Sequence, residues 1–396
     1  MIPKQEIMDL SREFSLEVKT VEKDYVLGWL LAGIETNAEL RDKWIFKGGT
    51  CLKKCYFETY RFSEDLDYTL VDGQHLDENF LKENFKQVAA WIYDNAGIEI
   101  PANNVRFDVY QNSAGKTSVE GSVYYIGPLQ RRGSLARIKL DLTADEVLVL
   151  PKTMREVHHP YSDKPDNGIK SNCYSFPEIF AEKIRALAER ARPRDLYDVV
   201  HLYRHADAGL NVNNILEVLR KKCNYKKIPL PTMESMNSHP KLHELESEWG
   251  NMLAHQLPLL PSRDSFWQEL PNLFAWLYGK GSKGSLESAP VGNERINSVW
   301  QPPSMIRAWH MKAPLELIRY AAANHLCIEL AYNGTKRLIE PYDLKQTKEG
   351  NLIVIAVKHE TGEPRSYRVD RIQGIEVKPA TFVPKYAINM TPLLRY

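Results

Sequence analysis

The segment from Trp44 to Leu70 constrains the fold of this chain more than any other part of its sequence. A short apolar strand, Trp44 to Phe46, is predicted first, then Gly48-Gly49-Thr50, then a helix from about Cys51 to Glu58. Glycines at such a turn let the backbone approach a phosphate, and the amides of a following helix N-terminus favour an anion. The pattern predicts an α/β unit with a phosphate-binding turn, to which Thr50 adds a hydroxyl.

The strand predicted over Ser63 to Leu70 carries two carboxylates, Asp65 and Asp67. Side chains alternate faces along a strand, so these two point the same way. They repel one another unless a cation lies between them, and Mg²⁺ is the natural candidate. An isolated Asp-x-Asp pair is also common in loops, so the pair needs support from the rest of the chain.

A third carboxylate, Asp141, lies on the strand predicted over Leu135 to Leu142. Alternation places it on one face with Lys139 and Thr143. Three carboxylates on adjacent strands can hold two metal ions, one for the attacking oxygen and one for the phosphates.

Two predicted helices follow. On the first, Glu178, Glu182 and Arg185 share one face with Lys183 beside it. The second begins near Pro193 and places Asp195 and Asp198 one turn apart. Spacing alone leaves open whether these residues serve a site or form a surface network of ion pairs.

Bulk composition is that of an ordinary globular protein of two or three domains, with 396 residues, 43% of them apolar and 26% charged. The net charge of +1 hides basic stretches at 131–139, 183–194 and 220–227, which are either solvated faces or contacts for a nucleic acid. The five cysteines form no C-x-x-C pair. We expect a cytoplasmic protein with no membrane segment, and we expect Cys51 and Cys55 to be small buried residues rather than metal ligands.

The ordered blocks Glu22-Lys23-Asp24-Tyr25, Phe46 to Leu52, Arg61 to Asp67, Asp141, Glu182-Lys183 and Arg194-Asp195-x-x-Asp198 resemble the AbiEii/AbiGii nucleotidyltransferase toxin family of type IV toxin–antitoxin and phage-defence systems. The resemblance implies a DNA-polymerase-β-like α/β core over 1–205 and a helical extension over 206–278. It also implies a Mg²⁺- or Mn²⁺-dependent enzyme that uses a nucleoside triphosphate and acts on RNA such as a tRNA acceptor end.

The same resemblance implies roles for individual residues. Metal ligands and catalytic residues would be Asp65, Asp67, Asp141, Lys183 and Asp198, although the match at Asp141 is looser. Nucleotide contacts would come from Gly48, Gly49, Thr50, Ser63, Lys183 and Arg194. A cognate antitoxin is the implied protein partner.

A Gly- and Ser-rich linker is predicted over 279–312, before a β-rich domain over 313–396. That domain resembles the WYL domain, an Sm/SH3-like β-barrel that binds nucleic acid or a nucleotide-like ligand. The naming tripeptide is absent; Leu352-Ile353-Val354 stands in its place. Aromatic and arginine side chains suited to stacking and phosphate contact are Tyr332, Arg337, Tyr342, Arg368 and Arg371.

The leading hypothesis is a toxin nucleotidyltransferase with a C-terminal sensing module. The alternative is a WYL-containing regulator that binds nucleic acid and has a non-catalytic nucleotidyltransferase fold. A third possibility is a toxin held inactive by its C-terminal domain.

Overall fold

The computed structural model describes residues 1–112, 115–206, 210–302 and 315–390. The chain divides into two compact units. One comprises residues 1–185 and 217–230, and the other comprises 186–216 and 231–395. The mixed α/β class predicted from the sequence is confirmed, with an α/β first unit and a separate antiparallel sheet in the second.

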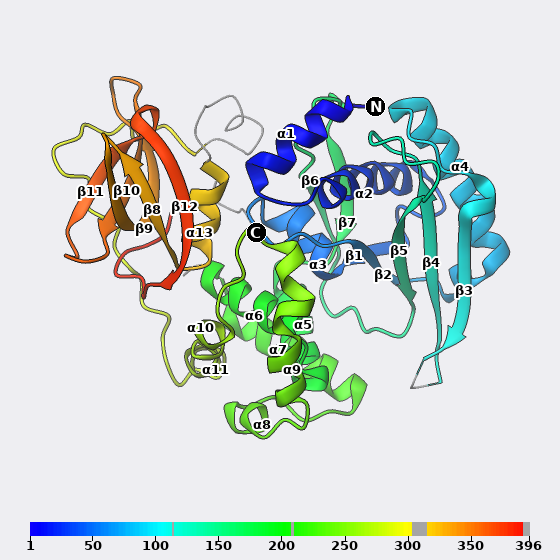
Figure 1. Cartoon of the computed structure of the whole chain (residues 1–396). Helices are drawn as coiled ribbons and strands as arrows, with labels where there is room; N and C mark the ends of the chain where they lie inside the picture. The colour runs from blue at the N-terminus through cyan, green and yellow to red at the C-terminus, as the bar shows by residue number, and fades with distance from the viewer. Residues whose placement is uncertain (113–114, 207–209, 303–314, 391–396) are drawn as a thin grey trace. The chain divides into compact units, whose positions relative to one another are not determined.

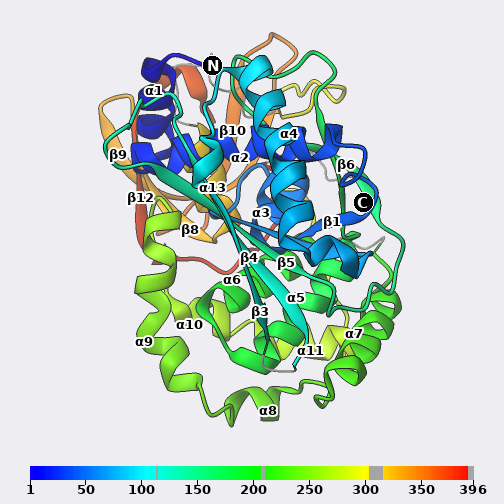
Figure 2. The same ribbon diagram turned by 90° about the vertical axis from the view of Figure 1, so that its right-hand side faces the viewer.

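The first unit is built on a seven-stranded sheet of order β3-β4-β5-β2-β1-β7-β6. Its inner strands β1, β2 and β5 lie where the sequence predicts strands over 44–46, 63–70 and 135–142. Figure 2 views this sheet from its β3 side. The strands are β1 (Trp44–Lys47), β2 (Asp65–Leu70), β3 (Val105–Gln111), β4 (Thr117–Tyr125), β5 (Ala136–Thr143), β6 (Thr153–Val157) and β7 (Ile169–Cys173).

Helices α2 and α4 pack against each other; α2 also contacts β7, and α4 contacts β3 (Figure 1). Apolar residues surround α2 on nearly every side, which is the pattern of a fully buried helix. The helices of this unit are α1 (Lys4–Phe14), α2 (Val18–Thr36), α3 (Gly48–Cys51), the π-helical turn η1 (Leu52–Tyr56), the 3-10 turns η2 (Gly73–Leu76) and η3 (Ala102–Asn104), α4 (Glu78–Ala96), most of α5 (Phe176–Arg190) and the end of α7 (Val212–Lys226).

The second unit joins a group of helices to the C-terminal sheet. The helices are α6 (Pro193–His205), α8 (Met233–Asn237), α9 (Leu242–Leu253), the 3-10 turn η4 (Ala254–Gln256), α10 (Arg263–Trp267), α11 (Leu270–Leu277) and α13 (Leu315–Ala323). On α6, the Tyr197 hydroxyl is 3.0 Å from Asn324 Oδ1, and Arg204 Nη1 donates to the Ala323 carbonyl at 3.1 Å. The predicted helical extension and the C-terminal domain therefore share buried contacts.

The C-terminal sheet, orange and red in Figure 1, has the order β11-β10-β9-β8-β12. All neighbouring strands are antiparallel. Its strands are β8 (Leu326–Tyr332), β9 (Thr335–Gln346), β10 (Leu352–Lys358), β11 (Pro364–Arg368) and β12 (Ile372–Thr381), with the 3-10 turn η5 (Val369–Arg371) between the last two.

Part of the predicted linker packs on this sheet. Ala289 is buried in the same cluster as Tyr342 and Phe382, and Val291 and Ile296 pack against it. The Asn297 amide donates to the Gln346 carbonyl at 2.9 Å. Residues 289–297 therefore act as an extra layer of the C-terminal domain, while the predicted linker over 303–312 and the predicted domain ends at 313–314 and 391–396 lie outside the described residues.

Within the described ranges, no helix combines the length and the apolar character that crossing a bilayer requires.

Candidate active site

Parallel pairing of β2 with β5 brings the predicted carboxylates together. Asp67 lies opposite Asp141, and Asp65 lies opposite Lys139. On the far side of β5, β4 places Glu120 opposite Asp141. Residues directly opposite one another share a face of the sheet, so four carboxylates line one patch.

The Asp67 carboxyl shows how crowded this patch is. Burial, and then the charges of Asp141 and Asp65, raise the pKa of Asp67 to about 6, although Lys183 and Lys47 oppose the shift. Asp67 is held in a place where its ionised form is disfavoured without further positive charge. The ordinary reading of an Asp-x-Asp pair as an exposed loop pair does not apply.

The pKa of Asp141 is raised as well, by burial and then by Asp65 and Glu120. Clustered carboxylate oxygens with raised pKa values match the preference of a hard divalent cation such as Mg²⁺ for oxygen ligands. A metal held by Asp65, Asp67 and Asp141 stays a prediction, and Glu120 lies opposite Asp141 on β4.

At Gly48 and Gly49, the neighbouring side chains leave no room for a Cβ atom. Gly48 has φ of 78°, and a Cβ atom there would overlap the Asp67 carboxylate. A Cβ on Gly49 would overlap the Arg61 guanidinium and lie 3.1 Å from Ser63 Oγ. The turn thus brings bare backbone against the carboxylate patch and places Ser63 beside it.

Thr50 is fully buried, and its hydroxyl donates to the Asp65 carbonyl at 2.5 Å. This bond ties the start of α3 to the first residue of β2. A phosphate contact by Thr50 stays a prediction.

Two lysines bring positive charge to the patch. Lys47 lies opposite Asp67 across β1 and β2, and its Nζ is 3.6 Å from Glu182 Oε1. Burial would lower the pKa of Lys47, but Glu182, Glu146 and Asp67 outweigh it and raise that pKa. The buried Lys183 lowers the pKa of Asp67, which places its charge near the carboxylates as the sequence predicted.

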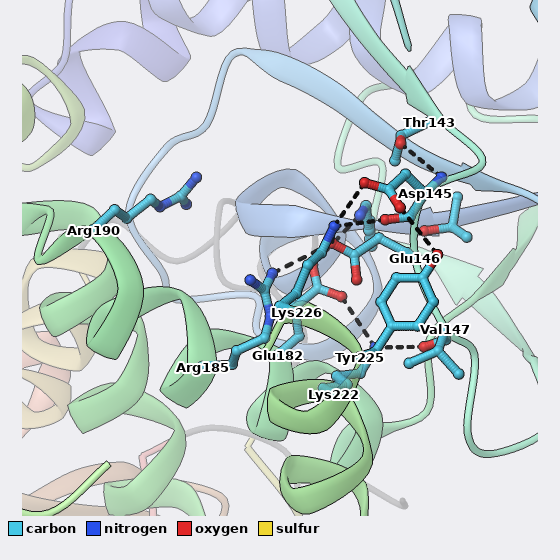
Figure 3. A network of polar contacts seen from close by, with 12 residues as sticks. Thr143, Asp145, Glu146, Val147, Glu182, Arg185, Arg190, Lys222, Tyr225 and Lys226 are labelled. Carbon is cyan, nitrogen blue, oxygen red and sulfur yellow. Dashed lines mark hydrogen bonds and ion pairs between the residues drawn. The ribbon is translucent and has the colours of Figure 1, made fainter. Parts of the chain in front are cut away.

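Behind the patch, α5 and α7 are joined by buried ion pairs (Figure 3). Lys222 is fully buried, with its Nζ 2.7 Å from Glu178 and 3.5 Å from Glu182. Lys226 lies 3.0 Å from Asp145. The predicted alternative of a surface network on α5 is therefore wrong: Glu178 has no exposed area, and it also accepts the backbone amides of residues 149 and 150.

Sequence reasoning missed Lys47, Glu120 and Lys222. Glu120 lies on β4, and it joins the patch only through the pairing of β4 with β5. Lys222 lay in a run of cations that reads as a solvated face, and only the fold shows that it is buried.

Arg194 and Asp198 lie on α6, in the second unit. Asp198 is fully buried, and Arg194 Nε donates to the Met252 carbonyl at 3.4 Å. Their neighbour Asp195 accepts two bonds from Arg190, at 2.6 and 2.9 Å. Catalytic or nucleotide-binding roles for Arg194 and Asp198 stay predictions.

On the C-terminal sheet, the predicted ligand contacts fall into two environments. The Arg337 guanidinium lies 5.8 Å from the centroid of the Tyr332 ring. The Tyr332 hydroxyl accepts a hydrogen bond from the backbone amide of Arg368. Arg371, which follows Arg368 closely in the sequence, is exposed. Tyr342 is instead fully buried, with its hydroxyl 3.0 Å from Glu340, so its side chain serves the core of the sheet.

The carboxylate patch, the Gly-Gly turn and the buried lysines on a mixed sheet are the features that the sequence predicted for a nucleotidyltransferase. A family model described as the nucleotidyl transferase AbiEii toxin of type IV toxin–antitoxin systems matches residues 29–276. The chain belongs to this family of toxins. A second family model, the WYL domain, matches residues 314–377. Both predicted resemblances are confirmed, and the alternative of a non-catalytic regulator is not supported.

Solved structures with similar folds include the nucleotidyltransferase toxin MenT4 of Mycobacterium tuberculosis, with 16% identity and a TM-score of 0.49 over 71% of this chain and 91% of that one. Another is JHP933 of Helicobacter pylori, with 15% identity and a TM-score of 0.43 over 67% and 94%. The comparison with curated proteins gave no match.

Proposed function

We propose that the chain moves a nucleoside monophosphate from a nucleoside triphosphate to a hydroxyl of an RNA, in a Mg²⁺-dependent reaction. The observation that carries this proposal is the alignment of Asp67, Asp141 and Glu120 in register beside the Gly48-Gly49 turn. When bound at Asp65, Asp67 and Asp141, the metal supplies charge neutralisation and helps deprotonate the attacking oxygen.

The chain's own residues position the triphosphate. The bare backbone of Gly48 and Gly49 would let a phosphate approach the start of α3. Lys183 and Lys47 offset the charge that builds up on the phosphates as pyrophosphate leaves. Glu182 pairs with Lys47 and holds it in place. Burial would raise the pKa of Glu182, but the charges of Lys47 and Lys222 lower it, so the carboxylate stays ionised.

RNA is the proposed acceptor, with the tRNA acceptor end as the favoured form. Two exposed cations of the stretch 131–139, Arg132 and Arg137, support a phosphate backbone as partner, and binding through them should weaken with salt. Cytoplasmic location, a role in a type IV toxin–antitoxin or phage-defence system, and a cognate antitoxin are proposed from the family.

Transfer of α-labelled nucleotide to bulk tRNA tests the proposal, with each of the four nucleoside triphosphates in turn. Wild type should label RNA with at least one of them, and Asp65→Asn/Asp67→Asn should label it at least a hundredfold less. Asp94→Asn, an exposed aspartate on α4, is the matched control and should behave as wild type. Equal labelling by the double variant would sink the proposal.

A further inference from the structure

Three cysteines meet behind the Gly48-Gly49 turn. The Sγ atoms of Cys51, Cys55 and Cys173 all lie within 4.8 Å of one another. Cys51 ends α3, Cys55 lies on the π-helical turn η1, and Cys173 ends β7 opposite Phe46 of β1. Two of these thiols come from one helical segment and the third from a strand far along the chain, so the fold creates a cluster that the sequence did not predict.

The spacing of the three sulfur atoms suits a thiophilic metal ion. A Zn–S bond of about 2.3 Å places sulfur atoms about 3.8–4.0 Å apart in a tetrahedral or trigonal site. Sulfur separations of up to 4.8 Å reach that geometry through side-chain shifts of under about 1 Å. Buried cysteines often serve only as small apolar residues, but that role does not require three sulfur atoms to converge.

Positive charge and a polar oxygen complete the surroundings. Arg155 Nε donates to the Cys55 carbonyl at 2.8 Å, and its guanidinium lies 4.3 Å from the centroid of the Tyr56 ring. The Tyr56 hydroxyl is 4.0 Å from Cys173 Sγ. Three thiolates and Zn²⁺ carry a net charge of −1, which the Arg155 guanidinium offsets.

We propose that Cys51, Cys55 and Cys173 form a binding site for a thiophilic d¹⁰ dication, with Zn²⁺ as the physiological ion. Binding replaces the three thiol protons, which leave to solvent, and forms three metal–sulfur bonds. Soft sulfur ligands separate this site chemically from the carboxylate patch, which prefers hard cations. Because Cys51 directly follows Thr50, the bound ion fastens the phosphate-binding turn to β7.

Metal content and a sulfur-specific spectrum test this site in the full chain. Untagged protein from zinc-supplemented cells, purified under a phosphine reductant, should hold about one zinc per chain. Exchange with Cd²⁺ should give a thiolate-to-cadmium charge-transfer absorption, which carboxylate sites do not give. The absorption should be lost in Cys55→Ala and kept in Cys223→Ala, a buried cysteine of α7 that lies outside the cluster.

A second measurement keeps the test decisive if Cys55→Ala does not fold. Alkylation of wild type with and without Cd²⁺, mapped by mass spectrometry, should show protection of Cys51, Cys55 and Cys173 only. A folded wild type without zinc and without the absorption overturns the proposal. So does an absorption that is unchanged in a folded Cys55→Ala. Neither result bears on nucleotidyl transfer, which depends on the carboxylate patch.

Discussion

Gly48 leaves no room for a side chain. Its positive φ strains any other residue by about 1 kcal/mol, and a Cβ atom would meet the Asp67 carboxylate directly. Its backbone cannot move away freely, since the bond from Thr50 to the Asp65 carbonyl fixes the chain two residues further on. Position 48 therefore reports on the geometry of the site rather than on its charge.

We predict that Gly48→Ala lowers nucleotide transfer at least tenfold, because it displaces the Asp67 carboxylate; a tenfold loss corresponds to about 1.4 kcal/mol in the transition state. Initial rates at saturating nucleotide measure the effect. Gly284→Ala is the control, because a Cβ atom at that position meets nothing within 4 Å. Wild-type rates in Gly48→Ala would contradict the account of the turn.

Asp67 should also destabilise the folded protein when no metal is bound. Its pKa rises from 3.8 to about 6 on folding, so folding favours the protonated form. The folded state then binds more protons than the unfolded state between these values, and stability falls as the pH rises from about 4 through 6.

We therefore predict that Asp67→Asn raises the unfolding free energy of the metal-free protein at pH 7 by about 1–3 kcal/mol. The gain should shrink toward zero below about pH 4, where wild-type Asp67 becomes protonated in both states. Denaturant melts in the presence of a chelator measure it, with Asp94→Asn as control. A variant less stable than wild type at pH 7 would show that Asp67 is not destabilised by its neighbours.

At the scale of elements, helix α7 anchors the site from behind. Lys222 reaches two buried glutamates of α5 and donates to the Val147 carbonyl at 2.9 Å. Glu182 is shared with Lys47 of β1, so α7, α5 and β1 are connected through one carboxylate. Removal of one partner from such a buried pair leaves an uncompensated charge.

We predict that Lys222→Met lowers the free energy of unfolding by about 3–5 kcal/mol, because Glu178 and Glu182 lose their buried cation. Lys221→Met is a matched control one residue away: Lys221 is exposed and pairs with Glu217 in the preceding turn, a solvent-exposed contact that adds little stability. Urea melts of both variants decide the matter. Equal stability of the two would show that the buried pairs add nothing.

The elements also show how far the sequence could be read. Strands β1, β2 and β5 were predictable because β1 is a short apolar run, while β2 and β5 alternate apolar residues with recognisable carboxylates. Glu120 was not singled out, and the cation run at 220–227 was taken as solvated or as a nucleic-acid contact. In both cases the surroundings are set by partners distant in the sequence, which periodicity cannot show. The same reason hid the meeting of Cys173 with Cys51 and Cys55.

At the scale of the whole molecule, the C-terminal domain is more than an appended sensor. Its helix α13 gives partners to buried residues of α6, and the Tyr320 hydroxyl donates to the Leu259 carbonyl. Tyr197, one of those α6 residues, stands next to Asp198. The third sequence hypothesis, inhibition by the C-terminal domain, would act through this shared core.

Deletion of the chain after Ser298 should therefore destabilise the second unit, since Tyr197 and Arg204 lose their partners on α13. We predict a thermal midpoint lower by several degrees, in line with a loss of a few kcal/mol. Asn324→Ala removes one contact of Tyr197 and should show a smaller shift in the same direction. A truncated chain as stable as the full one would show that the helices of the second unit fold without the C-terminal domain.

The carboxylate patch as a metal-dependent nucleotidyl-transfer site is tested most directly by following both ends of one nucleoside triphosphate. With α- and γ-labelled substrate, Mg²⁺ and tRNA, wild type should place the α-label in RNA and release the γ-label as pyrophosphate at the same rate. Chelation of the metal or Asp67→Asn should abolish both. Appearance of the γ-label in RNA, or undiminished α-label transfer by Asp67→Asn, would contradict the account.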